Sequence, residues 1–368
     1  MTWLQFHAES EKRAIEAKVA LAAKNEPRAA DLYRLAAELE QKALDSLEPN
    51  KTRTRGITAV SAVALWYKAN EYTAAERLAY GLLADEGIPD FARDQLRNLV
   101  QAIWTEHSKR EAGVTFLPGQ VSVSVKGGEV VTGGAPLDLI VDKVQSIQSI
   151  FYRTIEYLTG VAHRKHGPPS KDLQDACKPW LFQSVPGSYQ FSVAIQKPMQ
   201  ADFFKAEVAP SRIAQHFLEI VSASAGENIE ELESIVPNEE YRRTFLKLAR
   251  NLAPTGKKFE KIEFRGAGDS RSISLDPDSR TNINHNLRRS QEVAQGEVVA
   301  EELKGTLRAV HLDKDWLEVV SEGETIHVES LQEAVDDVIG PMVNRQVTVQ
   351  FIRTSSRKLK FVDIELDE

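Results

Sequence analysis

The chain of 368 residues contains 46 Lys and Arg residues against 54 Asp and Glu residues, and its formal net charge of −8 disfavours a protein that binds a nucleic-acid duplex mainly by neutralising phosphates. A hydrophobic fraction of 42% lets two or three domains each bury a core, and no apolar run is long enough to span a bilayer. The single cysteine, Cys177, excludes an internal disulfide framework and fits a cytoplasmic protein without a membrane segment.

Residues 1–112 are predicted to form a helical domain. Ala, Leu, Glu, Lys and Arg dominate this segment, which shows no strand-like alternation of polar and apolar residues. Pro27, Pro49 and Pro89 lie where helices should start or stop. Residues 1–12 contain no apolar signal core, so secretion is not expected. The predicted helices span residues 2–25, 27–48, 55–70, 72–86 and 89–112.

A faint repeat lies within this helical segment. One copy runs Asn25, Ala30, Tyr33, Ala37, and the other runs Asn70, Ala75, Leu78, Leu82. The second copy has aromatic residues at Trp66 and Tyr72 and a closing proline at Pro89. Over roughly residues 5–90 this pattern resembles the tetratricopeptide repeat, although asparagine replaces the family's turn glycine and the copies stand further apart than its 34-residue period. A three-helix bundle is the alternative.

The resemblance implies that pairs of helices stack into a concave surface that binds a peptide or another subunit. We expect the aromatic residues of the second copy to lie at or just beneath this groove. Two arginines before the third helix would contact an acidic peptide, with simple solvation of their side chains as the alternative. The candidate partner-binding residues are therefore Arg53, Arg55, Trp66, Tyr67 and Tyr72.

Residues 113–290 are predicted to form an α+β domain with helices packed on one face of a sheet. The period-two pattern at 120–125 predicts a strand, and apolar residues at helical spacing over 137–158 predict an amphipathic helix. A hairpin is expected over 180–195, around Pro186, Gly187 and Ser188. Two helices around 213–221 and 241–252 and a strand at 259–264 follow.

Residues 296–368 are predicted to form a small β-barrel. Strands are expected at 306–312, 316–320, 325–328, 346–352 and 359–366, with a short helix at 331–339 before the fourth strand. This order of three strands, a helix and two strands is typical of an OB-fold. An SH3-like barrel with an inserted helix gives nearly the same order and remains the alternative.

Two basic stretches could contact phosphate despite the acidic whole. The first includes Arg242, Arg243, Lys257 and Lys258, and the second is a hairpin with Arg353, Arg357, Lys358 and Lys360. In an OB-fold such a hairpin is one of the loops that contact oligonucleotides, and Phe351 and Phe361 beside it could stack on bases. The alternative is a solvated edge hairpin whose two phenylalanines lie in the core.

Catalytic signatures are missing from the sequence. The chain has neither a complete phosphate-binding loop nor the Gly-x-Ser-x-Gly nucleophile motif, and Cys177 is interpreted as a small buried residue. Arg164 and Lys165 separate His163 from His166, so this histidine pair is not expected to bind a metal. We predict no metal and no cofactor. An enzyme of unfamiliar type would draw on polar residues of the central domain, namely His163, His166, Asp269, Arg271 and His285.

Three functional hypotheses follow. The first is a non-enzymatic scaffold or adaptor that binds a protein or peptide through its helical module. The second is a binder of single-stranded nucleic acid that uses the C-terminal barrel. The third is an enzyme with its site in the central domain. Self-association into a homo-oligomer is compatible with all three.

Overall fold

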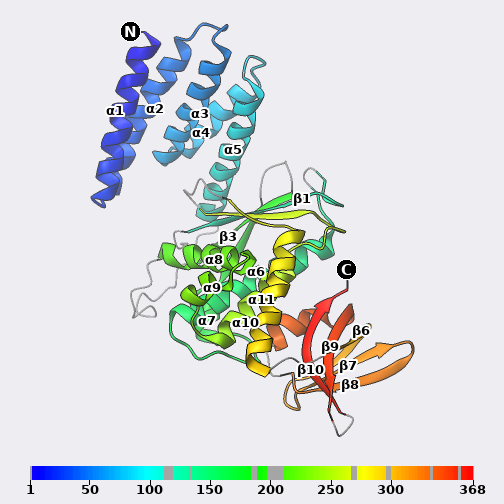
Figure 1. Cartoon of the computed structure of the whole chain (residues 1–368). Helices are drawn as coiled ribbons and strands as arrows, with labels where there is room; N and C mark the ends of the chain where they lie inside the picture. Colours follow the sequence, from blue (N-terminus) through cyan, green and yellow to red (C-terminus); the bar gives the residue numbers. More distant parts are fainter. Residues whose placement is uncertain are drawn as a thin grey trace. The chain divides into compact units, whose positions relative to one another are not determined.

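The computed structural model describes residues 2–111, 119–131, 134–183, 189–196, 210–266, 272–295, 300–331, 335–354 and 358–367. These residues form two compact units. The first, here called the helical unit, consists of the N-terminal helices. The second, here called the sheet–barrel unit, holds a central sheet, its helices and a C-terminal barrel (Figure 1). The predicted helical region, central sheet and barrel are thus confirmed.

Five helices make up the helical unit (Figure 1). Their bounds are α1 Trp3–Ala22, α2 Glu26–Asp45, α3 Thr52–Lys68, α4 Tyr72–Leu83 and α5 Asp90–Glu111. Each helix packs against the next along the chain, and α3 also packs against α5. The predicted helices are therefore all present, and most are a few residues shorter than expected because short turns occupy their ends.

Two of the turns in the helical unit close in the same way. Lys24 (φ 58°) and Asn70 (φ 62°) each adopt the left-handed conformation after a helix. The amide of the following residue bonds to a carbonyl five residues earlier, from Asn25 N to Ala20 O (2.9 Å) and from Glu71 N to Trp66 O (3.1 Å). Lys24, rather than Asn25, therefore corresponds to Asn70.

This correspondence shifts the predicted repeat by one residue in its first copy. The buried alanine five residues after the left-handed position is Ala29 in the first turn and Ala75 in the second, whereas Ala30 is only half-buried. Asn25 is instead the N-cap residue of α2. Its side-chain oxygen accepts a hydrogen bond from Arg28 N (3.2 Å) and so caps α2.

Small side chains dominate the buried surface of the helical unit. Alanines that are almost completely buried line the contacts between its helices: Ala17, Ala29, Ala36, Ala37, Ala43, Ala59, Ala62, Ala75, Ala79 and Ala92. Because alanine projects only a methyl group, helices that meet at alanines can approach closely. These close contacts accompany a core of larger apolar residues that includes Leu96, Val100 and Ile103.

The sheet–barrel unit begins with a five-stranded sheet. Its strands are β1 Val121–Lys126, β2 Pro179–Gln183, β3 Tyr189–Ile195, β4 Lys261–Gly266 and β5 Ile273–Leu275, in the spatial order β2-β3-β1-β4-β5. Strand β1 pairs antiparallel with both neighbours, so that Val123 lies opposite Phe191 on one side and Phe264 on the other. The predicted strands near 120–125 and 259–264 and the predicted hairpin strands correspond to β1, β4, β2 and β3.

Helices cover one face of this sheet (Figure 1). Their bounds are α6 Leu137–Leu158, α7 Lys171–Ala176, α8 Pro210–Ala225, α9 Ile229–Ile235, α10 Glu239–Leu252 and α11 Pro277–Gln295. Phe217 on α8 links the layers, because its ring stacks on Phe151 of α6 (centroids 4.3 Å apart) and meets Phe264 of β4 edge-on (5.8 Å). These rings form the centre of the core between helices and sheet.

Five strands close into the C-terminal barrel. They are β6 Glu301–His311, β7 Trp316–Ser321, β8 Glu324–Glu329, β9 Gln346–Arg353 and β10 Leu359–Leu366, in the closed order β10-β8-β7-β6-β9. The pair β8/β10 is parallel, and the other pairs are antiparallel. The interior consists of alternate strand residues, as the period-two pattern predicts.

The predicted helix at 331–339 differs from the structure. Its described part is a π-helical turn, Val335–Ile339, followed by a 3₁₀ turn, Gly340–Met342. The amide of Val335 bonds to the carbonyl of Lys165 (3.1 Å), in the loop after α6. The start of this turn is thus stabilised by a tertiary contact that local sequence does not show. Among the described helices of the whole chain, none is both long and apolar enough to cross a bilayer.

Candidate functional site

Four of the five predicted partner-binding residues lie at the two ends of α3, and the fifth, Tyr72, begins α4. Arg53 is exposed near the start of α3, and Arg55 forms an ion pair with Asp85 (2.9 Å). Trp66 and Tyr67 lie near its end, roughly 15–20 Å further along at 1.5 Å per residue. The structure therefore does not bring the arginines and the aromatic residues together.

The three predicted aromatic residues pack between helices. Tyr72 is only 8% exposed, and its ring centroid lies 5.4 Å from that of Tyr67. Its hydroxyl donates to the side chain of Asn70 (3.0 Å). The indole nitrogen of Trp66 donates to Gln41 Oε1 on α2 (3.2 Å). These side chains support the helical packing more than they line an open surface.

An exposed aromatic pair that sequence reasoning missed lies on α4 and α5. Tyr80 and Trp104 are each 44% exposed, and their ring centroids are 6.3 Å apart. Glu76 accepts a hydrogen bond from the indole nitrogen of Trp104 (2.7 Å) and so fixes the orientation of the ring. The helical spacing of α4 could have identified Tyr80 as exposed. The buried residues of this helix, Tyr72, Ala75, Ala79 and Leu82, lie on one face, and Tyr80 lies outside it.

The basic hairpin of the barrel is largely ion-paired. Arg353 pairs with Glu301 (2.9 Å), and Lys358 pairs with Glu329 (2.9 Å). Lys360 is half-buried on β10, and Arg357 lies outside the described residues. Phe351 and Phe361 are 4% and 5% exposed, so these rings belong to the core. The interpretation of the two phenylalanines as base-stacking groups is wrong, and the alternative of an edge hairpin with buried phenylalanines describes the rings correctly.

The other basic stretch does not form one surface. Arg242 binds Glu233 (3.6 Å) at the start of α10, and Lys258 binds Asp138 (3.7 Å) beyond its end, with a 14-residue helix between them. Arg243 is half-buried on α10, and Lys257 is exposed beyond it. The intervening Lys247 and Arg250 are buried. A run of positive charges in the sequence is therefore divided among separate contacts.

Lys247 and Arg250 share one buried carboxylate. Asp363 on β10 lies 3.0 Å from Lys247 Nζ and accepts a bond from Arg250 Nη2 at 3.2 Å. Arg250 Nη2 also donates to the carbonyl of Ile364 (2.6 Å). Burial by itself would raise the pKa of Asp363, but the charges of Arg250 and Lys247 outweigh it and hold that pKa well below its usual range. The carboxylate is therefore ionised and joins α10 to the barrel.

The net charge of the protein is concentrated in its C-terminal segment. Residues 300–368 contain fifteen Asp and Glu residues against eight Lys and Arg residues, a formal charge of −7 out of the chain's −8. Phosphate binding requires a local excess of positive charge. This segment thus carries a net negative charge, the opposite of the local excess that phosphate binding requires.

A second aromatic group that sequence reasoning missed lies on β7 and β8. The ring centroid of Trp316 lies 5.2 Å from that of His311 and 4.7 Å from that of His327. His327 Nδ1 lies 3.7 Å from Glu318 Oε1. Trp316 is half-buried on its strand, and the neighbouring Leu317 points into the barrel. These rings meet through the pairing register of the strands, which cannot be inferred from the positions of the residues in the sequence.

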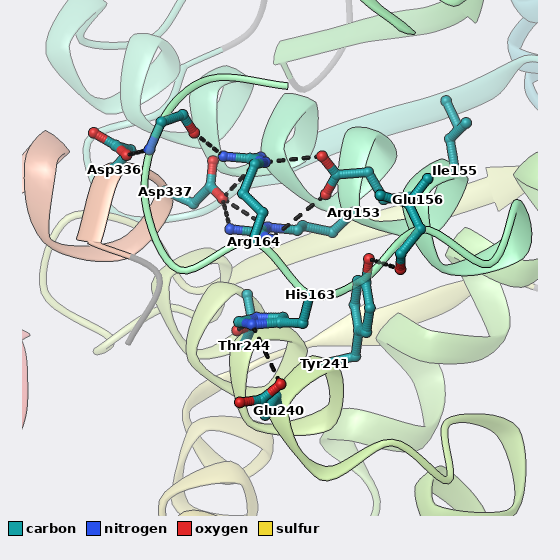
Figure 2. A network of polar contacts seen from close by, with 12 residues as sticks. Arg153, Ile155, Glu156, His163, Arg164, Glu240, Tyr241, Thr244, Asp336 and Asp337 are labelled. Atoms are coloured by element: carbon teal, nitrogen blue, oxygen red, sulfur yellow. Dashed lines mark hydrogen bonds and ion pairs between the residues drawn. The ribbon is translucent and has the colours of Figure 1, made fainter. Parts of the chain in front are cut away.

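Figure 2 shows a polar network that joins α6 and the loop after it to the turn Val335–Ile339. Arg153 is completely buried, and its Nε donates to Asp337 Oδ2 (2.7 Å). Arg164 donates to Glu156 Oε1 (2.8 Å) and to Asp337 Oδ2 (3.2 Å). Asp336 accepts a bond from the amide of Gly167. Because these charges satisfy one another, the network is a structural link rather than a site open to substrate.

Of the candidate residues for an enzyme, the described part of the chain contains three, all of them histidines. His163 packs against α10 and bonds to Thr244 Oγ1 (2.9 Å; Figure 2). His166 and His285 are exposed. Burial and the charge of Arg153 lower the pKa of His163 to about 4, so the ring is neutral at pH 7. Asp269 and Arg271 lie outside the described residues.

Cys177 and the other metal-ligating side chains give no sign of a reactive centre. Cys177 is completely buried, and burial raises the pKa of its thiol to about 12. The described residues contain no group of three His, Cys, Asp or Glu side chains placed to hold a metal ion. Comparison with protein-family models, with curated proteins and with solved structures gave no significant match to this chain.

Proposed function

We propose that the protein is a non-enzymatic adaptor that binds a protein partner through its helical unit. The observation that carries the proposal is the exposed pair Tyr80 and Trp104 on α4 and α5. Tryptophan and tyrosine are the residues most enriched at the energetic centres of protein interfaces. The bond from Trp104 to Glu76 holds the indole in one orientation before any partner arrives, which lowers the entropy lost on binding.

The arrangement of the helices supports a tetratricopeptide-like interpretation. Consecutive helices pack as neighbours, and the turns after Lys24 and Asn70 close with the same hydrogen bond and are followed by the buried alanines Ala29 and Ala75. Stacked helical pairs of this kind present extended surfaces to peptides or to other subunits. The exposed aromatic pair gives that surface a point of attachment.

The test uses a partner recovered by crosslinking. A photoreactive benzoylphenylalanine at Arg77, which is exposed one turn before Tyr80, should crosslink the partner, whereas the same group at Lys12 on α1 should not. The double variant Y80A/W104A should then bind the purified partner at least about tenfold more weakly, because two anchor side chains are removed. Unchanged affinity in a folded Y80A/W104A variant would contradict the proposal.

A second candidate function concerns the barrel. We infer an OB-fold, supported by the closed order of its strands and by the parallel pairing of β8 with β10. Trp316 lies on the second strand of this barrel with His311 and His327 beside it, and in an OB-fold the second and third strands form the ligand-binding face. Rings in this position can stack on the bases of a single strand.

The charge of the barrel makes this second candidate the weaker one and also gives its test. Binding of the oligonucleotide dT12 should fall steeply as salt rises if phosphates are bound, and W316A should weaken it about tenfold. If Arg353, Arg357 and Lys358 form the site instead, their joint replacement by Ala should abolish binding. Absence of dT12 binding at low salt would leave protein binding as the function of the barrel.

A further inference from the structure

A groove of about 650 Å³ lies at one edge of the central sheet. It is lined by one face of α8, the start of α9, the short edge strand β5 and Ser279 of α11. Its volume falls within the range of sites that bind a small molecule or a short peptide segment. Neither the aromatic pair of the helical unit nor Trp316 belongs to this groove.

Strand β5 gives the groove an edge that can pair with another chain. Its three residues pair antiparallel with β4, so that Ile273 lies opposite Phe264 and Leu275 opposite Ile262. On its other side, no strand pairs with β5 within the described sheet. An open strand edge beside a groove is the geometry in which an extended peptide adds a strand to a sheet.

The lining of the groove is acidic and rich in hydroxyl groups. Its described lining contains the carboxylates of Glu219 and Glu231 and four serines, and no Lys or Arg occurs among these described residues. The serines are Ser222, Ser272, Ser274 and Ser279. His216 contacts Glu219 (2.8 Å) without being part of the lining. The groove therefore offers acceptors for cationic side chains.

Apolar and unpaired polar groups complete this surface. Leu218 and Ile273 are partly buried at the floor of the groove, above the buried ring of Phe264. The hydroxyl oxygen of Ser274, on the edge strand itself, is buried without a hydrogen-bond partner in the described structure. A buried polar atom without a partner is costly, and a ligand that bonds to it removes that cost.

We propose that this groove binds an extended, basic segment of a partner protein, which adds a strand to the edge of β5. Alternate residues of such a strand point to the same side. Lys or Arg side chains would meet Glu219 and Glu231, and intervening apolar residues would cover Leu218 and Ile273. The groove belongs to the sheet–barrel unit and does not depend on the adaptor function of the helical unit.

The probe is a fluorescein-labelled peptide of four Lys-Val repeats, and the measurement is its anisotropy with the full chain. We expect binding with a dissociation constant in the micromolar range, about −8 kcal/mol or weaker. Ser222 is exposed on α8, so S222W should fill the groove without disturbing the fold and weaken binding at least about tenfold. The variant E219Q/E231Q should weaken it by a similar factor, because both carboxylates are neutralised.

Matched controls separate strand addition from general attraction to an acidic protein. Q148W places the same side chain at an exposed position of α6, and E322Q/E324Q neutralises two exposed carboxylates of the barrel; both should bind the peptide as the wild type does. Hydrogen exchange of the amides at 273–275 should slow when the peptide is bound. No binding at about 100 µM peptide, an equal loss in the controls, or unchanged exchange at 273–275 would each overturn the proposal.

Discussion

The two units of this protein bury different kinds of side chain. The described part of the helical unit buries one charged side chain, Glu40, and otherwise buries alanines together with larger apolar residues such as Leu96 and Ile103. The sheet–barrel unit buries several charges, namely Lys143, Arg153, Glu156, Lys247, Arg250 and Asp363. Buried charges require specific partners, so they fix the relative position of the elements that carry them. Apolar packing therefore assembles the helical unit, whereas the sheet–barrel unit adds buried ion pairs to its apolar core.

The ion pairs of the second unit connect segments that the sequence places far apart. Asp363 joins β10 to α10, Asp337 joins the turn before β9 to α6, and Arg345 binds Asp142 of α6 (2.7 Å). All three link the barrel to the central helices. Consequently the predicted central domain, 113–290, and the predicted barrel, 296–368, fold against each other within one compact unit.

The largest expected effect comes from removing the shared carboxylate of the second unit. D363A removes the buried carboxylate that neutralises both Lys247 and Arg250, and the free energy of unfolding of this unit should fall by about 3–5 kcal/mol. Hydrogen exchange of the α10 amides measures this loss. D367A, which removes an exposed carboxylate four residues further along the chain, should change it by less than about 0.5 kcal/mol.

The same carboxylate predicts the response to acid. The folded pKa of Asp363 is below its unfolded value. Its contribution to the free energy of unfolding is therefore complete above the unfolded pKa of about 4 and is lost as pH falls below that value. Among the described residues of the helical unit, Glu40 is the only buried carboxylate, and it contacts His7 (3.0 Å) instead of a Lys–Arg pair. The α4 amides of this unit should therefore resist acid better than those of α10, and equal sensitivity of the two would contradict the comparison.

His163 is the second group whose titration distinguishes the units. Its folded pKa of about 4 lies below the ordinary value of 6.5, so the unfolded chain binds a proton between these values and the folded chain does not. Stability of the sheet–barrel unit should fall by about 2–3 kcal/mol as pH drops from 6.5 to 4. H163Q should remove most of this dependence, whereas H166Q at an exposed position should keep it.

A prediction of intermediate size tests the close packing of helices at alanines in the helical unit. Ala75 is completely buried where α4 meets its neighbours, so A75F should cost about 1–3 kcal/mol by forcing the helices apart. Exchange of the α3 and α4 amides measures the loss, and the α10 amides should not change. R77F adds the same ring at an exposed position of α4 and should be nearly neutral. A loss in R77F as large as in A75F would show that the helix itself is weakened.

Local patterns in the sequence predicted the elements well and the site poorly. The apolar period of α6, the alternation of β1 and the order of the barrel strands are written in neighbouring residues, and the structure contains all three. Arg250 and Asp363 are more than a hundred positions apart, so the stretch around Arg250 was interpreted as an exposed basic patch. Likewise Trp316 and His327 meet only through the pairing of β7 with β8. Charge is visible in a sequence, but burial and cross-strand contact are not.

The smallest expected effect, and the only stabilising one, concerns the turn after α1. Lys24 has a left-handed backbone (φ 58°), which costs a side chain with a Cβ more than it costs glycine. K24G should therefore raise the stability of the helical unit by about 0.5–1 kcal/mol, and N70G by less, because asparagine already tolerates this conformation and its side chain accepts a bond from the Tyr72 hydroxyl. K18G, at an exposed position inside α1, should lower stability by about 1 kcal/mol. Thermal unfolding of the three variants measures the contrast. If K24G and K18G are destabilising to the same degree, the equivalence of the turns at Lys24 and Asn70 fails, and with it the repeat that supports a stacked helical surface.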